Sequence, residues 1–179
     1  DTKTPQGILC LVRQKQYSIT EIVKEKGGEL PLLLVLDQIQ DPGNLGTIVR
    51  TAEGAGVTGI VMSQDCVDMY NPKVVRSTMG AAYRVPFCYV DDLAKEVKQM
   101  KEAGICTYAA HLEGKNSYDE EDYRRASAFL IGNEGNGLRD EVAEQAQVYI
   151  RIPMKGQVES LNAAVATAIL TFEAARQRR

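Results

Sequence analysis

The sequence has no tryptophan and a single histidine, His111, and its four cysteines never form a CxxC pair. One histidine excludes a His-rich metal site, and a Ser-His-Asp mechanism would have to use that residue. The wide spacing of the thiols does not match a disulfide or zinc framework. We therefore expect Cys10, Cys66, Cys88 and Cys106 to be reduced core residues of a cytoplasmic protein.

Long hydrophobic runs and an excess of basic residues are also lacking. The longest apolar run, LPLLLVL at 30–36, is far short of the ~20 residues that cross a bilayer, and no signal peptide opens the chain. With 21 Lys and Arg against 24 Asp and Glu, the net charge of −3 alone argues against a polyanion partner. The charge is unevenly distributed along the chain, because residues 91–122 carry a net charge of −5 and the remaining residues carry +2.

The length and composition suit one soluble domain. A chain of 179 residues, 44% of them hydrophobic, is enough to bury a core without disulfide or metal crosslinks. The polar start DTKTPQG differs in composition from the remainder of the chain. We expect residues 1–6 to be the end of an interdomain linker and residues 7–179 to form a single domain.

Short apolar runs alternate with amphipathic segments along the chain. The runs predict strands covered on both faces, at 8–13, 32–36, 59–63, 86–90, 105–110, 128–132 and 147–152. Helices are predicted at about 18–26, 44–55, 71–79, 91–103, 137–146 and 160–176. Asp91 is the expected N-cap of the fourth helix, and Gly104 its C-terminal stop. This alternation predicts an α/β fold, a mainly parallel sheet flanked by helices, with ligands at the carboxyl ends of the strands.

The loop after the second predicted strand contains a D-P-G turn at 41–43, followed by Asn44, which is well placed to cap the next helix. Arg50 follows nearly two helical turns later and can lie on the same side. Taken alone, these residues are a turn, an N-cap and a solvated arginine. Glycines on both sides of Asn44, beside a positive charge, instead suit a phosphate or ribose that approaches the backbone.

A second loop, GNEGNGL at 132–138, directly follows a buried strand. Its glycines allow a ligand to approach the main chain closely. A flexible turn is the plain alternative. The lone carboxylate of Glu134 within a glycine loop favours a binding or catalytic role.

The third loop, IPMKGQVESLN at 152–162, leads into an alanine-rich helix. Ser160 is the expected cap of that helix, and Ser160 and Asn162 offer a hydroxyl and an amide to a ligand. The alanine face permits close packing against another element or a second subunit, although alanine is also simply the best helix former.

One motif match is discarded. Residues 54–59, GAGVTG, satisfy GxGxxG, but they follow a helix and precede a strand. The dinucleotide fingerprint needs the opposite order, so this segment is a turn. The glycine loop at 132–137 also lacks the Lys-Ser/Thr pair of a P-loop.

Together, the three loops resemble the three motifs of the SpoU (TrmH-like) family of the SPOUT superfamily, the RNA ribose 2′-O-methyltransferases. Segment 37–52 is similar to motif 1, segment 132–138 to motif 2 and segment 152–162 to motif 3, and the resemblance extends over about residues 7–177. Three motifs in this order are highly specific, whereas any one is weak. The resemblance implies that residues 7–179 are the catalytic domain and that an N-terminal RNA-binding domain is absent from this chain.

The resemblance also implies a C-terminal trefoil knot, although knots are otherwise almost absent from proteins. It implies a homodimer formed through the first and last helices, and no metal. Its cofactor is S-adenosylmethionine, bent within the knot and held mainly by main-chain atoms. The residues placed to hold it are Gly132, Asn133, Ile152, Met154 and Leu161, with Ala109 or Ala110.

The implied reaction transfers a methyl group from a sulfonium to a ribose 2′-hydroxyl, so the protein must orient the hydroxyl and assist its deprotonation. The family's leading candidate for the base is Arg50. Because arginine normally stays protonated, we hypothesise that Arg50 instead grips the target phosphate and stabilises the forming alkoxide. Asn44, Ser160 and Asn162 would position Arg50 and the ribose. Glu134 would orient the Asn44 loop or the base.

His111 follows a strand end near the implied cofactor pocket, but the family does not rely on a histidine there, so we assign it no catalytic role. RNA is the implied partner, with rRNA favoured over tRNA because members with an additional N-terminal domain often act on rRNA. Four residues near the second loop region look like RNA contacts, although each alone could be a solvated surface residue: Tyr70, Lys73, Arg76 and Arg84.

Two other functions stay open from the sequence. One is a non-catalytic RNA-binding or dimerisation module of the same fold, against which the five intact polar residues of the motifs argue. The other is a nucleotide-binding α/β enzyme, which a parallel sheet alone would suggest. A correctly placed phosphate fingerprint is lacking for that alternative.

Overall fold

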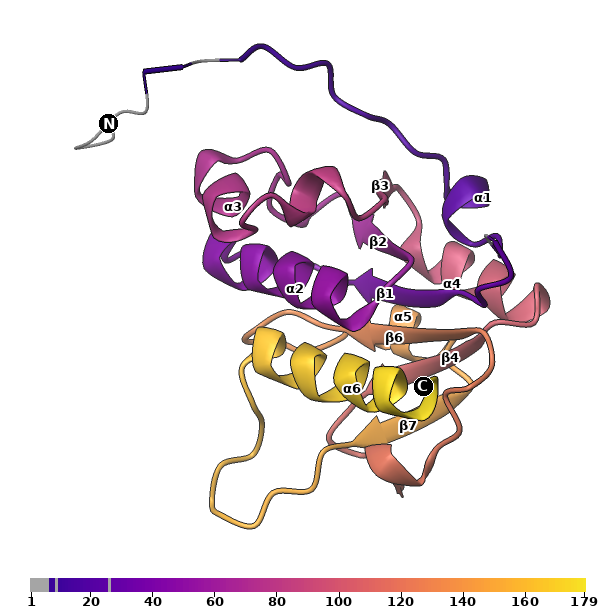
Figure 1. Ribbon diagram of the computed structural model, residues 1–179. Coiled ribbons are helices and arrows are strands. Elements are labelled where there is room, and N and C mark those ends of the chain that lie inside the picture. The colour runs from indigo at the N-terminus through magenta and orange to yellow at the C-terminus, as the bar shows by residue number, and fades with distance from the viewer. Residues whose placement is uncertain (1–6, 9, 26) are drawn as a thin grey trace.

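The structure, a computed structural model, describes residues 7–8, 10–25 and 27–179, so the predicted linker end at 1–6 lies outside the described residues. The described strands form one parallel sheet in the order β3-β2-β1-β6-β4-β7-β5 (Figure 1). Their bounds are β1 (Leu32–Leu36), β2 (Gly59–Ser63), β3 (Phe87–Val90), β4 (Cys106–Ala110), β5 (Asn116–Ser117), β6 (Ser127–Ile131) and β7 (Val148–Arg151). The predicted parallel α/β fold is confirmed.

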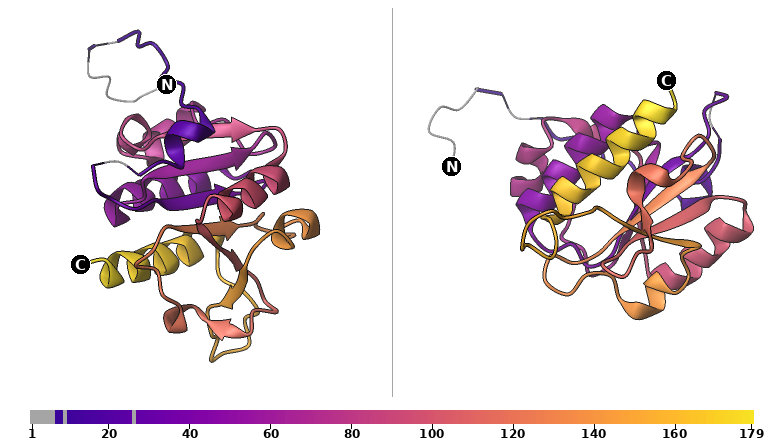
Figure 2. Two further views of the ribbon diagram at one scale, coloured as in Figure 1. Left: turned by 90° about the vertical axis from the view of Figure 1, so that its right-hand side faces the viewer. Right: turned by 90° about the horizontal axis from the view of Figure 1, so that it is seen from below.

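Helices cover both faces of this sheet. Their bounds are α1 (Ile19–Ile22), α2 (Pro42–Ala55), α3 (Pro72–Ser77), α4 (Leu93–Glu102), α5 (Asp140–Ala143) and α6 (Ala163–Gln177), with 3₁₀ turns η1 (Ala81–Tyr83) and η2 (Tyr118–Glu120). α2 and α6 pack side by side on one face, and α4 and α5 lie on the other (Figure 2).

Alternation along β1 shows why the strands are continuously apolar. Leu32, Leu34 and Leu36 belong to the core beneath α2 and α6, whereas Leu33 and Val35 belong to the core beneath α4 and α5. Side chains of a strand point to opposite faces in turn, so a strand covered on both sides has no polar face.

The predicted strand at 8–13 is wrong. Leu11 is fully exposed and Val12 is 64% exposed, because this segment extends away from the sheet and pairs with no described strand (Figure 1). Cys10 is exposed for the same reason, which corrects its assignment to the core, whereas Cys66, Cys88 and Cys106 are buried free thiols as expected. The two-residue strand β5 was not predicted.

Several helices are shorter than their apolar patterns predict. The helix predicted at 71–79 ends at Ser77, because Met79 and Gly80 adopt left-handed backbone angles, with φ of 52° and 86°. The helix predicted at 137–146 begins only at Asp140, after Gly137 at φ 73°. Asp92, and not Asp91, caps α4, since its carboxylate accepts from the main-chain N–H of Lys95.

No helix in the described part of the chain is long and apolar enough to cross a membrane. The C-terminal trefoil knot implied by the resemblance stays a prediction.

Candidate active site

The site lies where the central strands end. Leu36 of β1 is in register with Ile131 of β6, and Ala110 of β4 with Ile150 of β7, so the loops after these strands leave from the same edge of the sheet. A cavity of about 560 Å³ opens there, within the usual size of small-molecule sites. Its walls come from three loops, at 110–112, 131–138 and 150–154, and from segment 159–166 at the start of α6.

The glycine loop forms one wall of this cavity. Asn133 and Gly137 exchange main-chain hydrogen bonds of 2.9 Å, and the Asn133 side-chain oxygen accepts from the N–H groups of Gly135 and Asn136. A Cβ atom at Gly132 would lie 2.1 Å from the main chain of Gly137. Only glycine fits at position 132, and its absent side chain lets the loop fold back on itself.

Helix caps at the site differ from the sequence prediction. Asp41, and not Asn44, caps α2, because its carboxylate accepts from the Asn44 N–H at 2.7 Å. Asn162, and not Ser160, caps α6, because its side-chain oxygen accepts from the Ala164 N–H at 2.9 Å. The Asn44 side chain is thereby left available for a contact outside its own helix.

Side chains from all three motif loops meet in one chain of hydrogen bonds. The Asn44 amide donates to Glu134 Oε1 at 2.9 Å, and the Asn162 amide donates to Asn44 Oδ1 at 2.9 Å. The main-chain N–H of Asp41 also donates to Glu134 Oε1, at 3.3 Å. The structure therefore brings Asn44, Glu134 and Asn162 together at the rim of the cavity.

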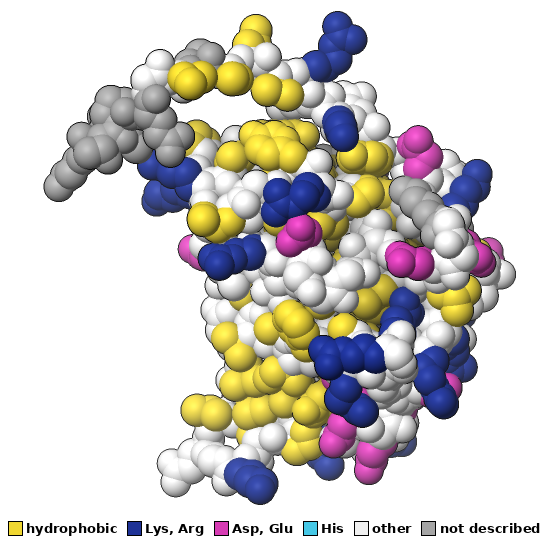
Figure 3. Space-filling view, in the orientation of Figure 1, with side chains coloured by type: hydrophobic (Ala, Val, Ile, Leu, Met, Phe, Trp, Pro, Cys, Tyr) yellow, Lys and Arg dark blue, Asp and Glu magenta, His cyan; other side chains and the backbone are white. Residues whose placement is uncertain are grey.

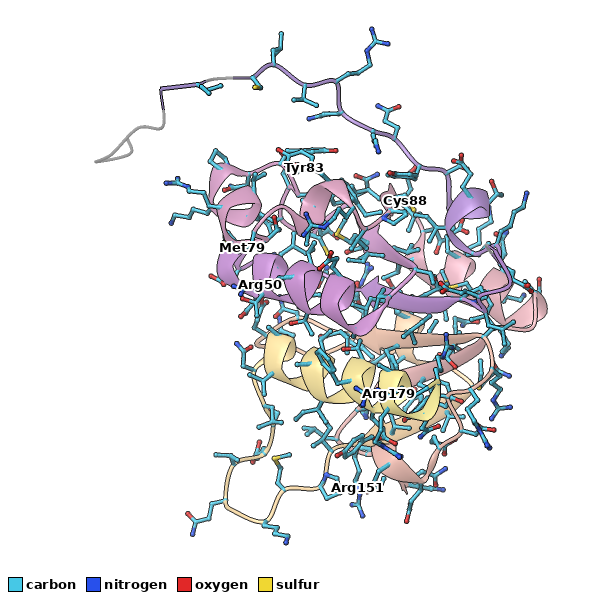
Figure 4. The ribbon with its side chains drawn as sticks, viewed as in Figure 1. Arg50, Met79, Tyr83, Cys88, Arg151 and Arg179 are labelled. Carbon is cyan, nitrogen blue, oxygen red and sulfur yellow. The ribbon has the colours of Figure 1, made fainter. Side chains whose placement is uncertain are left out.

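Arg50 and Ser160 are not part of this hydrogen-bonded chain. Arg50 is exposed on α2, on the side of the molecule where α2 and α6 begin (Figure 4), and its side chain has no hydrogen bond or ion pair with any residue that the structure describes. Ser160 lines the cavity. Such an arginine is available to an external anion, since no internal carboxylate neutralises it.

Gly46 has a packing role rather than the ligand role expected from the sequence. A Cβ at this position would lie 1.6 Å from Ser77 Oγ, so glycine permits the close approach of α2 and α3. Gly43 is exposed at the start of α2.

The residues predicted to hold a cofactor divide between cavity wall and core. Ala109 is fully buried in the core, so of the two alanines only Ala110 is at the cavity. His111 also lies at the wall, where its Nδ1 accepts from the Glu113 N–H at 3.2 Å and its ring centre is 5.1 Å from that of Tyr149. The predicted residues that line the cavity are Ala110, Gly132, Asn133, Ile152, Met154 and Leu161.

The four predicted RNA contacts lie on and around α3 and η1. Lys73, Arg76 and Arg84 are exposed, and Tyr70 is half-buried with its ring centre 5.7 Å from that of Phe87. Arg84 forms an exposed ion pair of 2.7 Å with Glu53 of α2. In the view of Figure 3, Lys and Arg side chains lie both on the upper part of the face and at its lower right, and a hydrophobic surface covers its lower left.

Sequence reasoning missed three polar residues that hold the loops together: Asp37, Asp41 and Arg139. Asp41-Pro42 was interpreted as a turn, although Asp before Pro also signals an N-cap. Asp37 directly follows a strand at the carboxyl edge, which was the available signal for it. Among the residues that the structure describes, no group of three His, Cys, Asp or Glu could hold a metal ion.

Comparison with known proteins identifies close similarity over most of the chain. Residues 31–172 match the SpoU rRNA Methylase family. The chain is 38% identical over 164 residues to the 23S rRNA (guanosine-2′-O-)-methyltransferase RlmB of Xylella fastidiosa, covering 92% of this chain and 66% of that protein. It is 34% identical over 172 residues to the 23S rRNA (guanosine(2553)-2′-O)-methyltransferase RlmP of Bacillus subtilis, covering 96% of this chain and 66% of that protein.

A solved structure extends this likeness to three dimensions. The AdoMet-bound rRNA methyltransferase of Sinorhizobium meliloti matches with a TM-score of 0.82 and 36% sequence identity, over 91% of this chain and 61% of that one. The chain thus spans slightly under two thirds of the length of these relatives.

Proposed function

Because the chain belongs to the SpoU rRNA methylase family, we propose that it transfers a methyl group from S-adenosylmethionine to a ribose 2′-hydroxyl of RNA. The observation that carries this proposal is the chain of hydrogen bonds from Asn162 through Asn44 to Glu134, at the rim of a cavity of suitable size. A non-catalytic module would have no need for polar side chains from three separate loops to converge there.

The cavity fits S-adenosylmethionine. The glycine loop, whose fold a Cβ at Gly132 would prevent, lines the cavity with three residues that have no side chain, so a ligand can approach the main chain of this wall closely. Apolar side chains of Ile152, Met154 and Leu161 line other parts of the wall. These residues, with Ala110 and Asn133, would hold the cofactor. When bound, it supplies an electrophilic methyl group on a sulfonium.

The protein's part in the reaction is to bind and orient the ribose and to stabilise negative charge on its 2′-oxygen. Arg50 is exposed and has no internal partner among the described residues, so it can grip the target phosphate and stabilise the forming alkoxide. Glu134 holds the Asn44 amide, and Asn44 is tied in turn to Asn162. Asn44, Asn162 and the cavity-lining Ser160 position the ribose beside Arg50.

RNA is proposed to approach over α3 and η1, toward α2. Lys73, Arg76 and Arg84 are exposed there, and Tyr70 presents an aromatic ring. Cations bind the phosphate backbone, and removing a cation that binds a phosphate should lower the salt dependence of binding. Replacing both Lys73 and Arg76 by Ala should therefore weaken RNA binding and reduce the slope of log K against log salt by about 0.7 per cation on single-stranded RNA. Lys98→Ala on the exposed side of α4 is the matched control.

Ribosomal RNA is the favoured substrate, because the RlmB and RlmP relatives are 23S rRNA methyltransferases. We place the reaction in the cytoplasm, consistent with the buried free thiols of Cys66, Cys88 and Cys106. Mapping 2′-O-methyl positions in rRNA and tRNA from cells with and without the full-length protein tests the substrate. Loss of a tRNA mark alone would reject rRNA.

A homodimer through the first and last helices completes the proposal, and the surface of the last helix, α6, supports its part in the contact. Val165 and Phe172 of α6 are about half exposed, and Phe172 lies beside Gly54 of α2, so α2 and α6 share an apolar surface. Exposed apolar patches of this kind often mark subunit contacts. Replacing Val165 and Phe172 by Ser should convert a dimer to a monomer in analytical ultracentrifugation.

Arg50→Ala and Arg50→Lys test the catalytic assignment. The side chain is exposed, so both variants should fold normally. We expect methyl transfer to RNA to fall by about two orders of magnitude in Arg50→Ala, because a bidentate charged contact to a phosphate or alkoxide contributes roughly 2–4 kcal/mol. Arg50→Lys should restore part of the rate. Wild-type turnover in either variant would remove Arg50 from the chemistry.

A further inference from the structure

An ion pair between a buried carboxylate and a partly exposed guanidinium connects the two loops that carry Asn44 and Glu134. Asp37, the first residue after β1, is fully buried, and Arg139 lies at the exit of the glycine loop, just before α5. Arg139 contacts the Asp37 carboxylate through its main-chain N–H at 3.0 Å, through Nε at 2.9 Å and through Nη2 at 2.7 Å. Two hydrogen-bond donors and one ion-pair contact from a single residue hold this carboxylate.

The entrance of the glycine loop is tied to the same segment. The Asn133 amide donates to the main-chain oxygen of Gln38 at 2.8 Å. Gln38 has a φ of 54°, a left-handed conformation that is unfavourable for a residue with a side chain. Its N–H donates to Ser63 Oγ at 3.0 Å, so β2 also supports this conformation. The strained residue turns its carbonyl toward the glycine loop.

The loop between these two attachments carries Glu134. Entry and exit of the segment 133–139 are anchored to residues 37 and 38, and its tip contacts Asn44 and Asp41. Leu138 is buried between the two ends. A short loop anchored at both ends has little freedom, so its anchors determine where the Glu134 carboxylate lies.

Burial makes the ion pair an unusual choice for stability alone. Desolvating an ion pair can cost more than its attraction contributes, so an apolar pair of similar size would stabilise the fold as well or better. The hydrogen bond to the Asp37 carboxylate raises the pKa of the Arg139 guanidinium from its ordinary value, so the guanidinium stays charged at neutral pH. What Arg139 offers beyond stability is direction, because Nε and Nη2 both contact Asp37 Oδ1 while the main-chain N–H donates to Oδ2, so both carboxylate oxygens are held in place.

We propose that Asp37 and Arg139 are positioning residues for methyl transfer: they hold the glycine loop so that Glu134 orients the Asn44 amide. Neither side chain lines the cavity, and their effect passes through Glu134. This inference rests on the proposed function for its kinetic consequence, whereas its geometric consequence can be measured without any reaction.

The geometric test follows the Asn44 side-chain amide by ¹H–¹⁵N NMR. In Glu134→Ala, which removes the acceptor, the Asn44 Nδ2 resonances should move away from their wild-type positions. Arg139→Lys retains the positive charge but loses the two guanidinium contacts to Asp37 through Nε and Nη2. In this variant the Asn44 Nδ2 resonances should move in the same direction. An Asn44 amide that moves in Glu134→Ala but keeps its wild-type position in Arg139→Lys would overturn the proposal, whether or not the protein methylates RNA.

The kinetic test is a double-mutant cycle on kcat. Arg139→Lys should lower kcat about tenfold in the wild-type background and leave it unchanged in the Glu134→Ala background, since two residues that act through one contact are not additive. A merely structural role would reduce kcat by the same factor in both backgrounds, and that result would contradict the proposal. Arg124→Lys, in the exposed ion pair with Asp122, is the matched control and should not change kcat. Inactive wild-type protein would reject the proposed function and leave the NMR result to decide the geometry.

Discussion

The side-chain amide of Asn44 donates to Glu134 Oε1 at 2.9 Å, although 90 residues separate the two along the chain. The contact joins the start of α2 to the tip of the glycine loop. With the further bond from Asn162 to Asn44, it links three loops that the sheet places at one edge. This convergence of distant polar residues is the feature on which the account of the site depends.

Removing the Glu134 carboxylate should impair catalysis more than cofactor binding. Glu134→Ala leaves the Asn44 amide and the Asp41 N–H without their acceptor. A hydrogen bond to a charged group contributes about 1.5–3 kcal/mol, so kcat should fall roughly tenfold to 150-fold. Calorimetry should give an S-adenosylmethionine affinity within a factor of about three of wild type, because Glu134 is only one of many residues that line the cavity.

Glu102→Ala, at the exposed end of α4, is the control for Glu134→Ala and should retain full turnover. If Glu134→Ala itself retained full turnover, the hydrogen-bonded chain would have no part in catalysis.

Local patterns in the sequence predict part of this fold, whereas contacts between residues far apart in the chain, such as Asn44 with Glu134, cannot be predicted from it. β1 and β2 have the predicted bounds, because a continuous apolar run between turn signals has few alternatives inside a parallel sheet. The run at 8–13 is also mainly apolar, but its described residues pair with no described strand, and pairing is a tertiary property.

The same limit applies to the site. The motifs identified Asn44, Glu134 and Asn162 as site residues. The motifs did not show which side chain caps a helix and which joins the chain of hydrogen bonds, because that depends on the three-dimensional geometry. Asp41 caps α2, so the Asn44 side chain is available to donate to Glu134. The Asp37–Arg139 pair spans 102 residues, and no local pattern connects its two members.

Adding one methyl group at Gly132 should disrupt the cofactor cavity. In Gly132→Ala the new Cβ would lie 2.1 Å from the main chain of Gly137, which cannot move without opening the loop. Overpacking of this kind costs about 1–3 kcal/mol, so S-adenosylmethionine binding should weaken about 5-fold to 150-fold in calorimetry.

The control for this loop is Gly156→Ala. No atom lies within 4 Å of a Cβ at that position, so its affinity should match wild type. Equal affinities for Gly132→Ala and Gly156→Ala would show that the glycine loop does not shape the cofactor site.

Arg178 should stabilise the C-terminal end of α6. Its guanidinium donates to four main-chain oxygens, at 2.6–3.0 Å, from Leu30, Pro31, Tyr123 and Arg125. Burial lowers the pKa of this guanidinium from its ordinary value, and the carbonyl dipoles offset the loss of hydration. Arg178→Ala should reduce the free energy of unfolding by about 2–4 kcal/mol in urea titrations.

Arg124→Ala is the matched control, since it removes an exposed ion pair with Asp122 and should change the free energy of unfolding by less than about 0.5 kcal/mol. Equal destabilisation by the two substitutions would contradict the anchoring role of Arg178.

Thiol reactivity should separate Cys10 from the other three cysteines. Burial raises the pKa of the Cys88 thiol to about 11 and also raises the pKa of Cys66, so thiolate is scarce at both positions at pH 8. Cys106 is shielded by burial, whereas Cys10 is exposed. Native protein should release one equivalent of chromophore rapidly from Ellman's reagent at pH 8 and the remainder only in denaturant.

Cys10→Ser should abolish that rapid phase. Two or more rapidly reacting thiols in the native wild-type protein would show that the buried cysteines are accessible.

The most direct test of the central claim is mass spectrometry of nucleosides from rRNA incubated with the protein and S-adenosylmethionine carrying a deuterated methyl group. The account predicts a 2′-O-methylated nucleoside that carries the label on its ribose, formed by the wild-type protein and strongly reduced with Glu134→Ala. Label found on a base, or no labelled nucleoside after incubation of rRNA with folded protein that binds S-adenosylmethionine, would contradict it.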